Sequence, residues 1–261
     1  MLESHEILKR GVSMKRYLLL VLVGLVILSL VISGCDNKTT VIRIATDATW
    51  PPFEYVDEDT KEIVGFDIDL INAIAEKEGL EIEIVNVAWD PLLAGMAQCT
   101  YDAAISAMTI TEERAEQFLF SDPYFFAGQI ITVHIDNTDI NSKHDLSGKV
   151  VGAQIGTTGA IEVGNIGGAQ LRTYDDIGLA MQDLMNGQID AVVADNPLAL
   201  SYVGENPDDL KTVGDVFTDE NYGIAICKDN TELQAQINSG LEAVMEEGLI
   251  DDLVDKWLVG D

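Results

Sequence analysis

The sequence predicts an α/β protein of two lobes that are joined by two extended crossovers and hold a ligand in the cleft between them. Three observations predict this fold. From about residue 40 the chain alternates strand-like and helix-like segments, and a second series of the same kind starts after Gln129. This order favours mostly parallel sheets covered by helices on both faces. Two segments with anion-binding chemistry also lie far apart, around Arg114 and around residues 156–159.

The beginning of the chain is typical of an export signal. Lys15 and Arg16 precede an apolar run over residues 17–32, which is followed by Ser33-Gly34-Cys35 and a polar stretch. A basic start, an apolar run and small residues at its end mark a signal peptide. The run is slightly short for a membrane-spanning helix, which needs about 17–25 residues. We expect a signal peptide of the lipoprotein type over residues 1–34 and a tether over 35–40.

The segment Ile32-Ser33-Gly34-Cys35 resembles a lipobox, in which the cysteine is lipidated and becomes the new N-terminus. An uncleaved N-terminal anchor is the alternative, and Met14 is a second candidate start. In either case the folded part is expected outside the cytoplasmic membrane, at its outer face or in the periplasm.

Composition excludes several classes of protein. The 261 residues are 47% hydrophobic, which is enough for a buried core, and the formal net charge is −30. So acidic a chain is expected to repel nucleic acid. Cys99 and Cys227 fit either one disulfide or two buried thiols. There is no CxxC motif and the three histidines are scattered, so neither a metal site nor a cofactor is expected.

The segments of the first half follow from periodicity. Apolar and polar residues alternate in the strands, and helical spacing precedes Gly79, a typical helix end. Thr111 begins a helix with acidic residues in its first turn, as the helix dipole favours. The expected order is strand 41–45, a proline-bearing loop 47–54, helix 66–78, strand 80–87, helix 91–98, strand 103–108 and a helix from 111.

The second half repeats this alternation and then returns to the first lobe. The expected elements are strand 149–153, a helix from 158, strand 170–174, helix 177–186, strand 191–194, strand 222–227 and helices over 231–258. Crossovers are expected near 127–131 and 218–223. We therefore assign residues 41–127 and 222–261 to the first lobe and 128–221 to the second.

The two anion-binding segments suggest a clamp for an α-amino acid. Arg114 offers a planar fork of donors that suits a carboxylate. The turn Gly156-Thr157-Thr158-Gly159 offers hydroxyl and N–H groups at a helix N-terminus. Asp195, further along, is suited to an ammonium group. Each of the three also has a simpler interpretation. Arg114 fits an exposed charge, and the turn at 156–159 fits an ordinary N-cap. Asp195 fits the cap of a turn with Asn196-Pro197.

Six motifs in one order make the chain resemble a known family. They are DATWPPFE at 47–54, GFDIDL at 65–70, SAMTIT at 106–111 with Arg114, FSDPY at 120–124, GTT at 156–158 and DAVVAD at 190–195. Together, over about residues 40–260, they resemble the polar amino-acid-binding proteins of ABC importers, solute-binding protein family 3.

This resemblance implies a fold and a function. The fold would be the type II periplasmic-binding-protein fold, which closes on its ligand by a hinge. The protein would be a monomer, tethered to the membrane by lipid, that delivers an amino acid to an ABC permease. It would not be an enzyme, although some dehydratases on the same fold resemble this family and are the alternative.

The resemblance also implies roles for single residues. Arg114 and the backbone of Thr109 would hold the ligand carboxylate from the first lobe. Thr158 would hold the same carboxylate from the second lobe, and Asp195 would pair with the ligand ammonium. Trp50 and Trp89 match aromatic positions along the ligand side chain, with core packing as the competing interpretation. We place five further residues of the matching segments in the ligand-binding set: Ser106, Ala107, Met108, Gln154 and Thr157.

Asp47 matches a carboxylate that reaches a cationic side chain in the members that bind basic amino acids. The expected ligand is therefore arginine, lysine or histidine, with glutamine or another polar amino acid as the alternative. Gly159 departs from the pattern, because the position after Thr158 is often polar in those members.

Overall fold

The computed structural model describes residues 41–259. The predicted signal peptide, Cys35 with its predicted lipid, and the tether lie outside the described residues. Within residues 41–259, no helix is both long and apolar enough to cross a membrane. The described part contains two five-stranded sheets, and each sheet with its helices is called a lobe below.

The first lobe is built on a sheet with strand order β5-β1-β6-β15-β7. Its strands are β1 (Ile42–Thr46), β5 (Ile82–Asn86), β6 (Ala103–Ala104), β7 (Leu119–Phe120) and β15 (Ala225–Ile226). β1 runs parallel to β5 and β6, whereas β15 runs antiparallel to β6 and β7. A small antiparallel sheet flanks this lobe, with strands β2 (Thr49–Trp50), β3 (Glu54–Val56) and β4 (Ile63–Val64).

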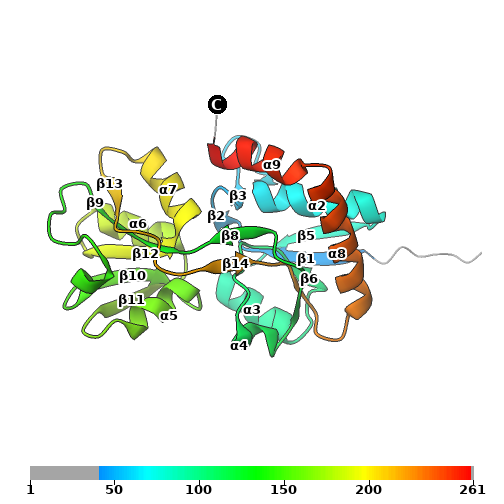
Figure 1. The fold of residues 1–261 in the computed structure, drawn as a ribbon, viewed down its shortest axis with the longest axis horizontal. Coiled ribbons are helices and arrows are strands. Elements are labelled where there is room, and N and C mark those ends of the chain that lie inside the picture. The colour runs from blue at the N-terminus through cyan, green and yellow to red at the C-terminus, as the bar shows by residue number, and fades with distance from the viewer. Residues whose placement is uncertain (1–40, 260–261) are drawn as a thin grey trace, which may run out of the picture. The chain divides into compact units, whose positions relative to one another are not determined.

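Helices cover both faces of the first sheet (Figure 1). On one side lie α2 (Phe66–Glu78), α8 (Thr231–Glu246), α9 (Leu249–Val254) and the terminal turn η2 (Asp255–Val259). On the other lie α3 (Trp89–Ala97) and α4 (Glu112–Ala115). Because β15, α8 and α9 follow the second sheet along the chain, the C-terminal segment returns to the first lobe.

The second lobe has strand order β11-β10-β12-β9-β13. Its strands are β9 (Gln129–His134), β10 (Val150–Gln154), β11 (Gln170–Tyr174), β12 (Ala191–Asp195) and β13 (Leu210–Val213). β10 is parallel to β11 and β12, and β9 is antiparallel to β12 and β13. Helix α5 (Thr158–Asn165) covers one face, and α6 (Ile177–Met185) and α7 (Asn196–Glu205) cover the other (Figure 1). The mixed α/β architecture with two lobes agrees with the predicted fold class.

Two strands carry the chain between the lobes. β8 (Phe125–Ala127) and β14 (Glu220–Tyr222) form an antiparallel pair in which Glu220 lies opposite Ala127. Phe53, from the first lobe, packs edge-on against Tyr222 and Phe125, with ring centroids 5.3 and 5.1 Å apart. The crossing strands are therefore anchored in an aromatic cluster on the side of the first lobe.

Most predicted elements are present, three need correction, and helix α7 was not predicted. The helix over 66–78 is confirmed and ends at Gly79 in the left-handed conformation (φ 64°). The expected strand 103–108 is only β6, because the backbone at Ala107 is left-handed (φ 43°) and the chain leaves the sheet. The expected strand 222–227 is divided between β14 and β15, and the loop 47–54 contains β2. Helix α7 (Asn196–Glu205) was not predicted. Pro197 lies in its first turn, where proline is well tolerated and does not prevent a helix.

The pairing of the two cysteines is settled by the structure. Cys99 and Cys227 form a disulfide with a Cα–Cα distance of 5.0 Å. Cys99 follows α3 and Cys227 follows β15, so the bond joins two segments of the first lobe that are 128 residues apart in the chain.

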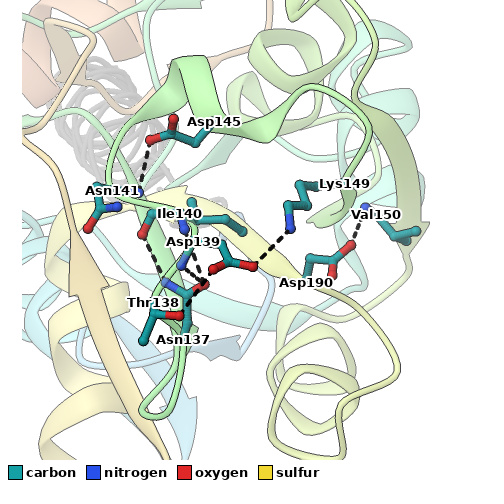
Figure 2. A network of polar contacts seen from close by, with 9 residues as sticks. All are labelled: Asn137, Thr138, Asp139, Ile140, Asn141, Asp145, Lys149, Val150 and Asp190. Carbon is teal, nitrogen blue, oxygen red and sulfur yellow. Dashed lines mark hydrogen bonds and ion pairs between the residues drawn. The ribbon is translucent and has the colours of Figure 1, made fainter.

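The segment that leads through the 3₁₀ turn η1 (Lys143–Leu146) into β10 is held by its own polar contacts (Figure 2). The Asp145 carboxylate accepts a hydrogen bond from the Asn141 N–H at 3.0 Å, and the Asp190 carboxylate accepts one from the Val150 N–H at 2.7 Å. These bonds fix the start of β10, whose other end carries Gln154.

Candidate functional site

A cavity lies between the two lobes and holds about 320 Å³ of space, including the part open to solvent. The residues that line it are Asp47, Trp50, Glu54, Trp89, Ser106, Ala107, Thr109, Arg114, Gln154, Thr157, Thr158 and Asp195. The structure therefore brings together every residue predicted for the ligand site except Met108, and it adds Glu54.

Met108 is directed away from the cavity. Its side chain is fully buried and belongs to the apolar cluster of Trp89, Leu92, Met96 and Phe118. The left-handed backbone at Ala107 ends the strand alternation, so that Ser106 and Ala107 line the cavity while Met108 packs in the core.

Arg114 is the cation of the cavity. Thr111 caps α4 by accepting a hydrogen bond from the Arg114 N–H at 3.2 Å, which orients the residue. The guanidinium donates to the carbonyl oxygen of Thr109 at 2.7 Å and to that of Gly156 at 3.1 Å. Burial lowers the pKa of Arg114 to about 10, against the opposing effect of nearby carboxylates. The group therefore stays charged at neutral pH, with further N–H donors for an anion.

The turn after β10 supplies the second half of the predicted clamp. Thr157 caps α5: its hydroxyl accepts from the Ala160 N–H at 3.3 Å and donates to the Gln154 carbonyl at 2.7 Å. Thr158 donates its hydroxyl to Glu220 at 2.8 Å. Both threonines line the cavity at the N-terminus of α5, where an anion is favoured.

Gly159 has a packing reason that the sequence did not reveal. A Cβ atom at this position would lie 2.7 Å from Oε1 of Gln129 and 2.9 Å from the carbonyl oxygen of Val193. The position faces the second sheet, so glycine is required there by close packing against β9 and β12.

An acidic cluster faces the cavity from the second lobe and the crossing strand. Asp195 accepts hydrogen bonds from the Tyr222 hydroxyl and from Gln129 Nε2. Burial, followed by the charge of Glu220, raises the pKa of Asp195 to about 7. With Arg114 and this cluster, the cavity offers both charges that a zwitterion needs.

Glu220 is a residue of this cluster that sequence reasoning missed. It is buried in β14 and accepts from Thr109 Oγ1 at 2.6 Å, Thr158 Oγ1 at 2.8 Å and Gln129 Nε2 at 3.1 Å. Thr109 belongs to the first lobe and Thr158 to the second, so Glu220 joins both at the crossover. Its position in the predicted crossover 218–223 was the only signal available.

A second group of polar residues is centred on Asp47, at the end of β1. Its carboxylate accepts from Thr49 Oγ1 at 3.0 Å and from Gln154 Nε2 at 3.0 Å. Burial raises the pKa of Asp47, while these two hydrogen bonds oppose the rise. Oε1 of Gln154 is buried and has no partner among the described residues. Asp47 and Gln154 thus present hydrogen-bond acceptors to a ligand.

The two tryptophans have different surroundings. Trp50 lies in β2 and is 8% exposed, and its indole N–H has no partner within the described part of the chain. Trp89, at the start of α3, carries the Arg114 guanidinium over its ring at 5.1 Å from the centroid. One face of Trp89 is therefore engaged by the protein's own cation and not by a ligand.

Comparisons with known proteins place this arrangement among binding proteins. Residues 42–260 match the model of the bacterial extracellular solute-binding proteins, family 3. The L-cystine-binding protein TcyJ of Escherichia coli strain K12 is 30% identical, covering 91% of each chain.

Two solved structures are similar in sequence and in fold. An ancestral arginine-binding protein bound to arginine is 43% identical with a TM-score of 0.80, covering 83% of this chain and 97% of that chain. The arginine-, lysine-, histidine-binding protein ArtJ from Geobacillus stearothermophilus is 36% identical with a TM-score of 0.80. The match covers 85% of this chain and 96% of that chain. The fold is accordingly that of the type II periplasmic binding proteins.

Proposed function

The chain belongs to the bacterial extracellular solute-binding proteins, family 3, and we propose that its ligand is a basic amino acid: arginine, lysine or histidine. The family and the relatives are solute-binding proteins and not enzymes, so the dehydratase alternative is set aside. A protein of this family is exported and binds an amino acid for an ABC transporter.

One observation carries the proposed preference: the buried carboxylate of Asp47 lines the same cavity as Arg114. If Arg114 and Thr158 hold the carboxylate of the ligand and Asp195 holds its ammonium, Asp47 remains for the side chain. A buried carboxylate is favoured by a cationic partner with hydrogen-bond donors. Trp50 adds an aromatic wall, and the free Oε1 of Gln154 adds an acceptor. Two of the similar structures bear names that specify arginine, or arginine, lysine and histidine, which supports the same reading.

Glutamine, or another polar amino acid, is the second candidate. The amide of glutamine could donate to Asp47 and Gln154 as a guanidinium does, and the relative TcyJ is named for cystine. A thermal-shift screen of the mature protein with arginine, lysine, histidine, glutamine, glutamate and cystine separates these ligands. We expect the largest stabilisation from the basic amino acids; stabilisation by glutamine or cystine alone would overturn the preference.

The proposed mechanism is capture followed by closure. The ligand first meets Arg114, Asp47 and Trp50 on the first lobe, residues 41–127 and 222–261. The second lobe, residues 128–221, then closes about β8 and β14 and brings Thr158 and Asp195 to the ligand. Closure selects ligands that satisfy both lobes. Small-angle scattering with and without ligand tests this motion, and an unchanged radius of gyration would oppose it.

We propose a monomer attached to the outer face of the membrane through lipid on Cys35. In cells that express the full chain, Cys35→Ser should move the protein from the membrane fraction to the soluble exported fraction. Retention of the variant in the membrane would favour an uncleaved N-terminal anchor.

A further inference from the structure

A pair of buried acids lies at one wall of the cavity, which Glu54 lines. Glu54 and Asp67 are both 0% exposed and lie within hydrogen-bond reach of one another. Oδ2 of Asp67 accepts from the Ala107 N–H at 2.7 Å and from the Tyr124 hydroxyl at 2.8 Å. Oε1 of Glu54 accepts from the Ser106 hydroxyl at 2.8 Å.

The other oxygen of each acid has no donor. Oε2 of Glu54 and Oδ1 of Asp67 are buried without a hydrogen-bond partner among the described residues. Two ionised carboxylates cannot share such a site at low cost, because burial and mutual repulsion both disfavour the second charge. The other titratable groups that act on the pair are Asp47 and Tyr124, and neither is a cation. One proton between the two unpartnered oxygens satisfies both.

We propose that Glu54 and Asp67 share one proton, held on Glu54, and that this pair positions the Ser106–Ala107 wall of the cavity. Asp67 takes the anionic role because it accepts two hydrogen bonds from Ala107 and Tyr124, which favour its charge. Burial and then the charge of Asp67 raise the pKa of Glu54 well above its ordinary range.

The pair has two consequences for the site. Asp67 accepts the Ala107 N–H and so holds Ala107 in its left-handed conformation. Glu54 accepts the Ser106 hydroxyl and so fixes that side chain. Ser106 Oγ in turn accepts the Asp47 N–H at 3.0 Å. Glu54 also brings no charge to the cavity it lines, which leaves Asp47 as the carboxylate for the ligand side chain. This positioning role rests on the proposed function, whereas the shared proton does not.

Infrared spectroscopy of the ligand-free protein at pH 8 tests the proton directly. Asp195, with its pKa near 7, is then largely ionised, and the part of the C=O band of protonated carboxylic acids that Glu54→Gln removes reports on the pair. We expect this band in the unmodified protein and in Glu58→Gln, an exposed control, and its loss in Glu54→Gln. Absence of the band from the unmodified protein, or its persistence in Glu54→Gln, would overturn the proposal.

Thermal unfolding of two ligand-free variants provides an independent test. In Glu54→Gln the carboxamide still donates to Asp67, so the Tm should change by less than about 2 °C. In Glu54→Met no donor remains and Asp67 keeps an unpaired buried oxygen, so the Tm should fall by roughly 5 °C. An equal fall in both variants would show that the charge of Glu54, rather than its proton, is needed. Because no ligand is present, a wrong assignment of the ligand cannot produce either result.

Discussion

The guanidinium of Arg114 donates a hydrogen bond to the carbonyl oxygen of Gly156 at 3.1 Å, although the two residues belong to different lobes. Gly156 lies in the turn before α5, and the same guanidinium also donates to Thr109 in its own lobe. Arg114 is therefore placed both to hold an anion and to join the lobes. The ligand-binding role and the closing motion are linked at one side chain.

Replacing Arg114 by alanine should weaken amino-acid binding at least about 30-fold, because a buried carboxylate loses its charged partner. Arg114→Lys should recover only part of the affinity, since an ammonium lacks the planar fork of donors. Calorimetric titration measures both variants. Arg172→Ala is the matched control, because Arg172 is half-exposed and paired with Asp183 in the second lobe. Unchanged affinity in Arg114→Ala would refute the assigned role.

Asp47→Asn should reduce the affinity for arginine roughly 10- to 100-fold, the usual range for loss of a charge-assisted hydrogen bond. Its effect on glutamine should be smaller, since a neutral amide gains less from the charge. Titrations of both amino acids into this variant measure the difference. Asp59→Asn, an exposed residue of the neighbouring turn, serves as the control. An equal loss for both ligands would argue against Asp47 as the selector of a cation.

Binding should release a proton near neutral pH. The pKa of Asp195 is about 7 without ligand because of burial and the charge of Glu220, and a ligand ammonium would lower it. Binding then favours the ionised form, so affinity should rise with pH up to about 7 and level off above it. Calorimetry at pH 6 in buffers of different ionisation enthalpy should detect release of up to about one proton. Proton uptake, or release that persists unchanged at pH 8.5, would contradict the pairing of Asp195 with an ammonium.

Gly159→Ala should destabilise the protein by about 1–3 kcal/mol, because the new Cβ atom would lie too close to Gln129 and the Val193 carbonyl. Urea unfolding measures the change. Gly164→Ala in the same helix is a sharp control: a Cβ atom there meets nothing within 4 Å, and alanine should stabilise the helix by up to about 1 kcal/mol. If both substitutions stabilise, the packing explanation of Gly159 is wrong.

Local patterns predicted a large part of this structure. The helix over Phe66–Glu78 was readable because its apolar spacing and Gly79 agree. Arg114, Thr158 and Asp195 could be placed in one site because their motifs occur in a familiar order. Met108 was misplaced, because it was included with its neighbours in the motif at 106–111, whereas its side chain packs in the core after the left-handed turn at Ala107.

Other features depend on contacts that no local pattern encodes. Glu220 meets Thr109 across 111 residues of chain, and Glu54 meets Ser106 across 52. The requirement for glycine at 159 arises from Gln129 and Val193, which lie in other strands. Long-range packing of this kind becomes visible only in three dimensions.

The central claim is that the cavity binds a basic amino acid through Arg114 at one end and Asp47 at the side chain. Calorimetric titration of the mature protein at pH 7.5 with arginine, and with glutamine under the same conditions, tests it most directly. The prediction is one saturable site with higher affinity for arginine than for glutamine. Tight binding of glutamine with no detectable binding of arginine, lysine or histidine would contradict it.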